Sequence, residues 1–178
     1  MRDYLYQTLE IKSGSIEKAP NQIFLDILKT QNIIENKRVN FFSQPRPSAS
    51  ILGVLNIFKA PTFLEKHRPA KNANDLLDLE GELGGSLFNQ SIPDASYKQF
   101  FYNNGSWFLH VSDKNREETT RFTIRENDAL KIINNGQQEE RMTAEEIKNL
   151  FTAVKLYDEV IDNKIYNPIP GQEYDLAA

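Results

Sequence analysis

The chain has 178 residues, of which 39% are hydrophobic and 26% are charged, and its formal net charge is −4. These values are typical of a globular protein with its own core, and the acidic balance predicts no general attraction to nucleic acid. The absence of cysteine excludes disulfides, thiol catalysis and iron–sulfur clusters. The first residues resemble no signal peptide and no window reaches about 18 apolar residues, so we expect a cytoplasmic protein without a membrane-spanning helix.

The N-terminal part combines helical patterns with a proline-rich segment. Apolar residues recur at helical spacing over residues 21–36, after Pro20, and predict a helix there, with a shorter one around residues 4–11. Repeated prolines predict an irregular segment over residues 39–73. This segment contains the most apolar stretch, residues 51–64, and residues 35–71 carry a local charge of about +5. We favour a buried apolar plug in a connector over peripheral contact of residues 51–68 with anionic lipid or an acidic partner.

Residues 74–88 form the next predicted helix. Leu76, Leu79, Leu83 and Leu87 lie on one stripe, while three glycines at 81, 84 and 85 gather on another face. Glycine is unfavourable inside a helix. We therefore favour an end of the helix near Gly84, and the alternative is that another backbone approaches closely along the glycine face.

A run of short strands follows. Strands are predicted at residues 97–102, 107–112, 119–125 and 129–133, with a short polar strand at 138–142. Asn103–Ser106 and Asn134–Gly136 are hairpin signals, and residues 113–118 form a charged turn. Strict alternation over residues 119–125 indicates a strand with one buried face and one solvent-exposed face.

The last predicted helix starts at a capping box formed by Thr143 and Glu146, and its apolar stripe extends to Ile165. Pro168 ends it, and residues 167–178 are expected to be a flexible tail whose terminal Leu-Ala-Ala resembles a bacterial degradation tag. We therefore predict an α+β fold in one domain over residues 1–166. It has N-terminal helices, an antiparallel meander of four or five strands and a long C-terminal helix packed on the sheet.

The sequence contains no assembled set of catalytic or cofactor-binding residues. Two histidines, His67 and His110, occur without a metal-binding spacing, so no metal is expected. The glycines around residue 84 lack the pattern of a nucleotide-binding loop, so no cofactor is expected. His110, Ser112 and Asp113 are close in sequence, but alternation along a strand does not arrange them as a triad. We therefore expect a protein that is not an enzyme.

One group of residues could form a binding surface on the sheet. If Trp107, Leu109 and Val111 face the core, then Phe108 and His110 face outward. The same alternation places Arg121, Thr123 and Arg125 on the solvent-exposed side of the later strand. Arginine and aromatic residues are enriched at binding surfaces. The alternative interpretation, which we favour, is an ordinary solvated sheet face. The candidate binding residues are Phe108, His110, Arg121, Thr123 and Arg125.

Four segments also carry a family resemblance: DLEGELGGSLF, FFYNNGSWFLHVSD, TTRFTIRENDALKI and NLFTAVKLYDEVIDNKIY. In this order and with this aromatic placement, residues 75–167 resemble a family of small uncharacterised proteins from reduced-genome candidate-phylum (Saccharibacteria-like) bacteria. The resemblance implies neither an activity nor specific site residues, but it raises the expectation that His110 and Arg121 matter.

The expected function is a non-enzymatic protein-interaction or adaptor module, which binds another protein through the sheet face or through residues 39–73. One alternative is an acidic homodimer similar to a secretion chaperone, by analogy of fold alone. The other is a small-molecule-binding protein or enzyme that uses His110 as acid–base and Arg121 as anion anchor. It requires both side chains in one closed pocket.

Overall fold

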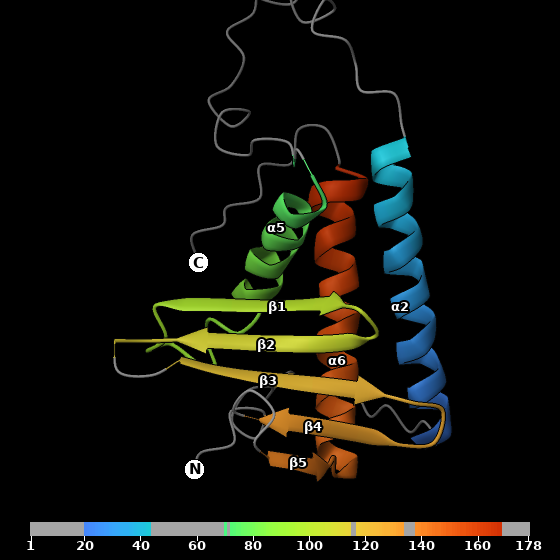
Figure 1. Ribbon diagram of the computed structural model, residues 1–178, viewed down its shortest axis with the longest axis vertical. Helices are drawn as coiled ribbons and strands as arrows, with labels where there is room; N and C mark the ends of the chain where they lie inside the picture. The colour runs from blue at the N-terminus through green and yellow to red at the C-terminus, as the bar shows by residue number, and fades with distance from the viewer. Residues whose placement is uncertain (1–19, 44–69, 71, 115–116, 134–137, 169–178) are drawn as a thin grey trace, which may run out of the picture.

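The computed structural model describes residues 20–43, 70, 72–114, 117–133 and 138–168. Helices α2 (Pro20–Ser43) and α5 (Ala73–Ser86) precede a five-stranded sheet, and α6 (Ala144–Ile161) and the short π-helix η1 (Asp162–Tyr166) follow it. The strands are β1 (Tyr97–Asn103), β2 (Ser106–Ser112), β3 (Glu117–Ile124), β4 (Ala129–Ile133) and β5 (Gln138–Arg141). They pair antiparallel in chain order (Figure 1). The predicted α+β meander is thus confirmed.

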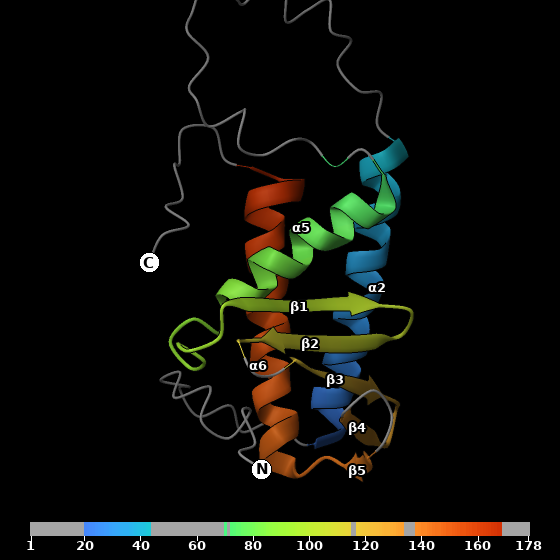
Figure 2. The same ribbon diagram turned by 60° about the vertical axis from the view of Figure 1, so that its left-hand side comes forward.

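The helices and the sheet form two layers. α2 and α6 lie side by side behind the sheet and cross its strands, while α5 lies along the β1 edge (Figures 1 and 2). The core fills the space between α6, α2 and the inner sheet face, as the pattern of alternating strands predicts. Of the described helices, none lies over the outer sheet face (Figure 1). Fully buried core residues include Ile27, Phe88, Phe100, Trp107, Phe122, Leu150, Tyr157 and Ile161.

Among the described helices, none is both long enough and apolar enough to cross a membrane.

The hairpin between β1 and β2 forms as its sequence predicts. Asn104 and Gly105 both have positive φ angles, 47° and 77°, as a two-residue turn of this type requires. This turn sets the register, so that Phe101 lies opposite Phe108 and Tyr102 opposite Trp107. Even-numbered β1 residues therefore face the core, and odd-numbered ones face outward.

The α5 glycines bring this helix against the backbone of β1. A Cβ atom at Gly84 would collide with the carbonyl oxygen of Phe100, and one at Gly85 with that of Lys98. The helix ends at Ser86, two residues after Gly84 and therefore near it, as predicted. The alternative, close approach of a second backbone along the glycine face, is also correct. α5 thereby covers one edge of the sheet, which would otherwise expose unpaired backbone groups.

The boundaries of two other elements differ from the prediction. α2 continues to Ser43, so residues 39–43, predicted to be irregular, are helical. The reason is tertiary contact, because the Phe41 ring packs edge-on against Tyr166 at 5.8 Å between ring centroids. β3 spans Glu117–Ile124, and the backbone N–H of Arg125 donates to the carbonyl oxygen of Asp128. Arg125 therefore lies in the β3–β4 turn and not on the strand.

The C-terminal helix starts at the predicted capping box. The N–H of Glu146 donates to the Thr143 hydroxyl, and the N–H of Thr143 donates to the Glu146 carboxylate at 2.7 Å. α6 ends at Ile161, four residues before the predicted limit of its stripe, and the backbone continues as η1 to Tyr166. Several predictions lie outside the described residues: the helix at 4–11, the apolar stretch at 51–64, the hairpin turn at 134–136 and the tail beyond residue 168.

Candidate functional site

The outer face of the sheet carries two pairs of rings. Phe101 and Phe108 stack with their planes 15° apart and their centroids 5.3 Å apart. Tyr97 meets His110 in an edge-on arrangement at 6.0 Å between ring centroids. We call these four residues the aromatic face. Tyr97 is 41% exposed, although large apolar and aromatic side chains are usually buried in the core.

His110 is oriented by its neighbours on β3. Its Nδ1 atom lies 2.9 Å from the hydroxyl oxygen of Thr119, which is directly opposite on β3. Its Nε2 atom lies 3.9 Å from the Glu117 carboxylate, whose side chain is 76% exposed. The ring is thus held in place at the surface, with one nitrogen in a hydrogen bond and the other near a carboxylate.

The structure brings most of the predicted site residues together. Arg121 lies opposite Phe108, and Thr123 lies opposite Ser106, with their hydroxyl oxygens 3.1 Å apart. All of them share the outer face with His110. Arg125 does not, because it lies in the β3–β4 turn. Four of the five candidate residues therefore lie on one surface: Phe108, His110, Arg121 and Thr123.

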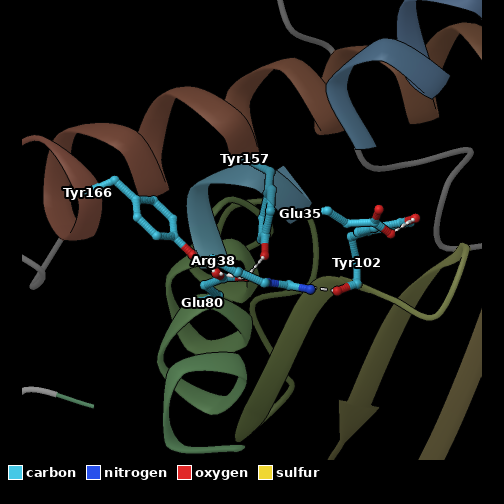
Figure 3. Close-up of polar contacts among 6 residues, drawn as sticks. All are labelled: Glu35, Arg38, Glu80, Tyr102, Tyr157 and Tyr166. Atoms are coloured by element: carbon cyan, nitrogen blue, oxygen red, sulfur yellow. Dashed lines mark hydrogen bonds and ion pairs between the residues drawn. The ribbon is translucent and has the colours of Figure 1, made fainter. Parts of the chain in front are cut away.

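A second group of polar residues lies inside the molecule (Figure 3). Glu80 of α5 is fully buried, and its two carboxylate oxygens accept hydrogen bonds from Nε of Arg38 in α2, each at 3.1 Å. The Tyr157 hydroxyl of α6 donates to the same carboxylate at 2.6 Å, and the Tyr166 hydroxyl of η1 also donates to it. We call Glu80, Arg38, Tyr157 and Tyr166 the Glu80 cluster. It joins α2, α5, α6 and η1.

Arg38 and Glu35 extend these contacts to the sheet. Arg38 donates through Nη2 to the carbonyl oxygen of Tyr102 at 2.7 Å, and the Tyr102 hydroxyl donates to Glu35 at 2.8 Å. Burial and the nearby Glu35 carboxylate raise the pKa of Tyr102 to about 12. The end of β1 is therefore fixed to α2 by both its backbone and its side chain.

In the Glu80 cluster, hydrogen-bond donors and a cation compensate the buried carboxylate of Glu80. Burial and the Glu80 carboxylate raise the pKa of Tyr157 well above its ordinary value, and they raise that of Tyr166 as well. Burial alone would lower the pKa of Arg38, but its hydrogen bonds and ion pair with Glu80 raise it. Both tyrosines therefore stay protonated donors, and the arginine stays charged. A buried carboxylate needs such partners, because desolvation without them is very unfavourable.

The neighbouring Lys37 joins α2 to the end of α6. Its Nζ atom lies 2.9 Å from Asp158 and 2.8 Å from Asp162. Burial alone would lower the pKa of Lys37, but the two carboxylates raise it, while the hydrogen bond from Lys37 lowers the pKa of Asp162. Two consecutive basic residues of α2 thus bind three other helical elements: Lys37 binds α6 and η1, and Arg38 binds α5.

Sequence reasoning missed the Glu80 cluster. One signal for it exists, because Glu80 lies four residues after Leu76 and three before Leu83, and so shares their stripe. A carboxylate on an apolar stripe needs a buried partner. The sequence does not show which residue supplies that partner, since Arg38 is 42 residues away from Glu80.

The two groups differ in what they can do chemically. The Glu80 oxygens are all engaged by protein donors, so the cluster is suited to holding helices together. The aromatic face presents half-buried rings, one of them an imidazole, beside the guanidinium of Arg121. Among the residues that the structure describes, no three metal-ligating side chains come together. The aromatic face is therefore the candidate functional site.

Comparisons with known proteins assign no family to this chain. No family model matches it, and no curated protein or solved structure is similar enough to count as a match. The resemblance to the candidate-phylum bacterial family therefore stays a prediction.

Proposed function

We propose that this protein is a non-enzymatic interaction module, which binds another protein through the aromatic face. The observation that carries the proposal is a set of two ring pairs, half-buried apart from the 41% exposed Tyr97, on an outer sheet face over which none of the described helices lies (Figure 1). Aromatic residues and arginine are enriched in protein–protein interfaces. Arg121, directly opposite Phe108, adds a cation beside the rings.

The fold also supports this role. A sheet whose inner face packs on α6 and α2 holds the outer side chains at fixed spacings. Cross-strand partners on one face lie about 4.5–5.5 Å apart, so a binding surface built on them loses little conformational entropy when a partner binds. The Glu80 cluster and the β1 edge contact of α5 fix the strand that carries Tyr97 and Phe101.

One geometric observation favours a second candidate function, small-molecule binding. His110 and Arg121 lie on the same outer face, in neighbouring strands and two register positions apart, as that alternative requires. It also requires a closed pocket around both side chains. The register places both on the sheet face that none of the described helices covers (Figure 1), so protein binding is the better supported function.

Site-specific photo-crosslinking tests the proposal. A photoreactive phenylalanine analogue would replace Phe108 in the full chain, expressed in the cells that naturally produce it. The matched control carries the analogue at Lys155, an exposed position on α6. We expect discrete cross-linked products from position 108 and none from position 155. Equal products from both positions, or none from position 108 in the folded protein, would refute the proposal.

A further inference from the structure

The aromatic face is bordered by carboxylates on its α5 side. Asp78 and Glu82 are exposed on α5, and neither forms an ion pair within the described part of the chain. Burial, followed by the charges of Glu82 and Asp78, raises the pKa of Tyr97. Both carboxylates therefore lie within electrostatic range of the Tyr97 ring. Gly81, on the same helix, faces the side chains of Phe101 and Gln99, because a Cβ atom added there would lie 3.3 Å from each of them.

A third carboxylate borders the same end of the face from β3. The register places Glu117 opposite Ser112 and Ser112 opposite Tyr97, so all three lie in one row across the sheet. The nearest lysine of β1, Lys98, faces inward and donates to the carbonyl oxygens of Ile92 and Ala95.

The remaining charges at this end do not offset the three carboxylates. In the described part of the β2–β3 loop, Asp113 and Lys114 carry opposite charges. The Tyr97–His110 end of the aromatic face is therefore acidic.

From this arrangement we infer that the partner contributes a basic segment. A lysine or arginine side chain of the partner binds at the Tyr97–His110 rings, between the carboxylates of α5 and β3. Apolar side chains next to it pack on Phe101 and Phe108. This inference rests on the proposed function and specifies the chemistry of the partner at the same site.

The physical basis is that rings and carboxylates favour the same ligand. A cation over an aromatic ring is attracted to the ring face, and nearby carboxylates add to this attraction. The same carboxylates repel a phosphate backbone or an acidic segment, and like-charge contacts suppress wrong partners. The two outer arginines, Arg121 and Arg141, lie farther along the face. Glu139 shares the Arg121 row with Ile132 between them, and Asp128 lies 3.9 Å from Arg141.

The test is selection of binding peptides by the full-length protein from a random peptide library displayed on phage. We expect the enriched peptides to contain lysine or arginine and few acidic residues. Their binding should fall at least about tenfold, or ~1.4 kcal/mol, in Phe108→Ala and in the double variant Glu82→Gln/Glu117→Gln. Glu159→Gln, which removes an exposed carboxylate from α6, is the matched control and should bind normally. Higher salt should weaken binding.

Different results separate the two proposals. Enriched peptides without basic residues, whose binding nevertheless depends on Phe108, would overturn the inference and leave the proposed function standing. No enrichment, or peptides that bind Phe108→Ala as tightly as the wild type, would overturn both. Self-association of the pure protein that Phe108→Ala abolishes would assign the face to a second copy and also overturn the inference. Circular dichroism must show that each variant is folded, and the double variant replaces only exposed carboxylates.

Discussion

Glu80→Gln removes the charge at the centre of the Glu80 cluster and keeps the shape of the side chain. The charge of Arg38 then loses its buried partner, and the new amide group places two donors beside the Tyr157 and Tyr166 hydroxyls. Breaking a buried ion pair from one side typically destabilises a protein by about 3–5 kcal/mol. The Arg38 side chain keeps 19% of its exposure, so we expect the lower end, about 3 kcal/mol. For a chain of this size that lowers the melting temperature by ~6–12 °C.

Urea and thermal unfolding, followed by far-ultraviolet circular dichroism, measure this effect. Glu82→Gln is the matched control, because it changes an exposed carboxylate on the same helix and should alter stability by less than ~0.5 kcal/mol. A double-mutant cycle with Arg38→Gln should give a coupling free energy above ~1 kcal/mol. Equal stabilities for Glu80→Gln and Glu82→Gln, or additive effects in the cycle, would show that the Glu80–Arg38 ion pair does not stabilise the fold.

Three further predictions concern the scaffold. Gly84→Ala should destabilise the protein by about 1–3 kcal/mol in urea unfolding despite alanine's better helix propensity, because the new Cβ would lie 2.7 Å from the Tyr157 ring. Gly81→Ala should be less destabilising, because its new Cβ would meet only side-chain atoms at 3.3 Å. A larger loss of stability in Gly81→Ala than in Gly84→Ala would contradict the packing described. Thr143→Ala should lower the unfolding free energy by about 1 kcal/mol through loss of the α6 cap, and no change by the same measurement would argue against the capping box. Burial would raise the pKa of Glu146, but Lys131 and the Thr143 amide lower it below 4.5. The stabilisation by the Glu146 carboxylate is therefore complete above pH 4.5 and is lost as the pH falls through the lower folded-state pKa. In unfolding experiments between pH 4.5 and 2, Glu146→Gln should lose less stability than the wild type, and parallel stability curves for the two proteins would refute this.

Features with a local cause were predictable from the sequence. The β1–β2 hairpin depends on two adjacent residues that accept positive φ, and the start of α6 depends on a box of four residues. The alternation along β2 and β3 assigned Phe108, His110, Arg121 and Thr123 to one face, and the register confirms it. Arg125 continues the alternation but not the strand, because a backbone hydrogen bond to Asp128 turns the chain there.

Features with a distant cause were not predictable. The Tyr157 and Tyr166 hydroxyls reach Glu80 across 77 and 86 residues, and no spacing in the sequence indicates that meeting. The last turns of α2 have the polar, aromatic composition of a loop, and contacts with η1 and α5 keep them helical. At Gly84 and Gly85, propensity indicated only a nearby helix end, and the close approach of β1 is the distant cause that requires glycine there.

The sheet face, and not the helical layer, is the surface that we propose binds a partner. Hydrogen–deuterium exchange of the full chain, alone and with an extract of the producing cells, distinguishes the two surfaces. We expect the extract to slow exchange in β1, β2 and β3 and to leave α6 unchanged, and Phe108→Ala should remove that protection. Slowed exchange confined to α6 or α2, or protection of the strands that survives in Phe108→Ala, would show that the aromatic face is not the binding surface.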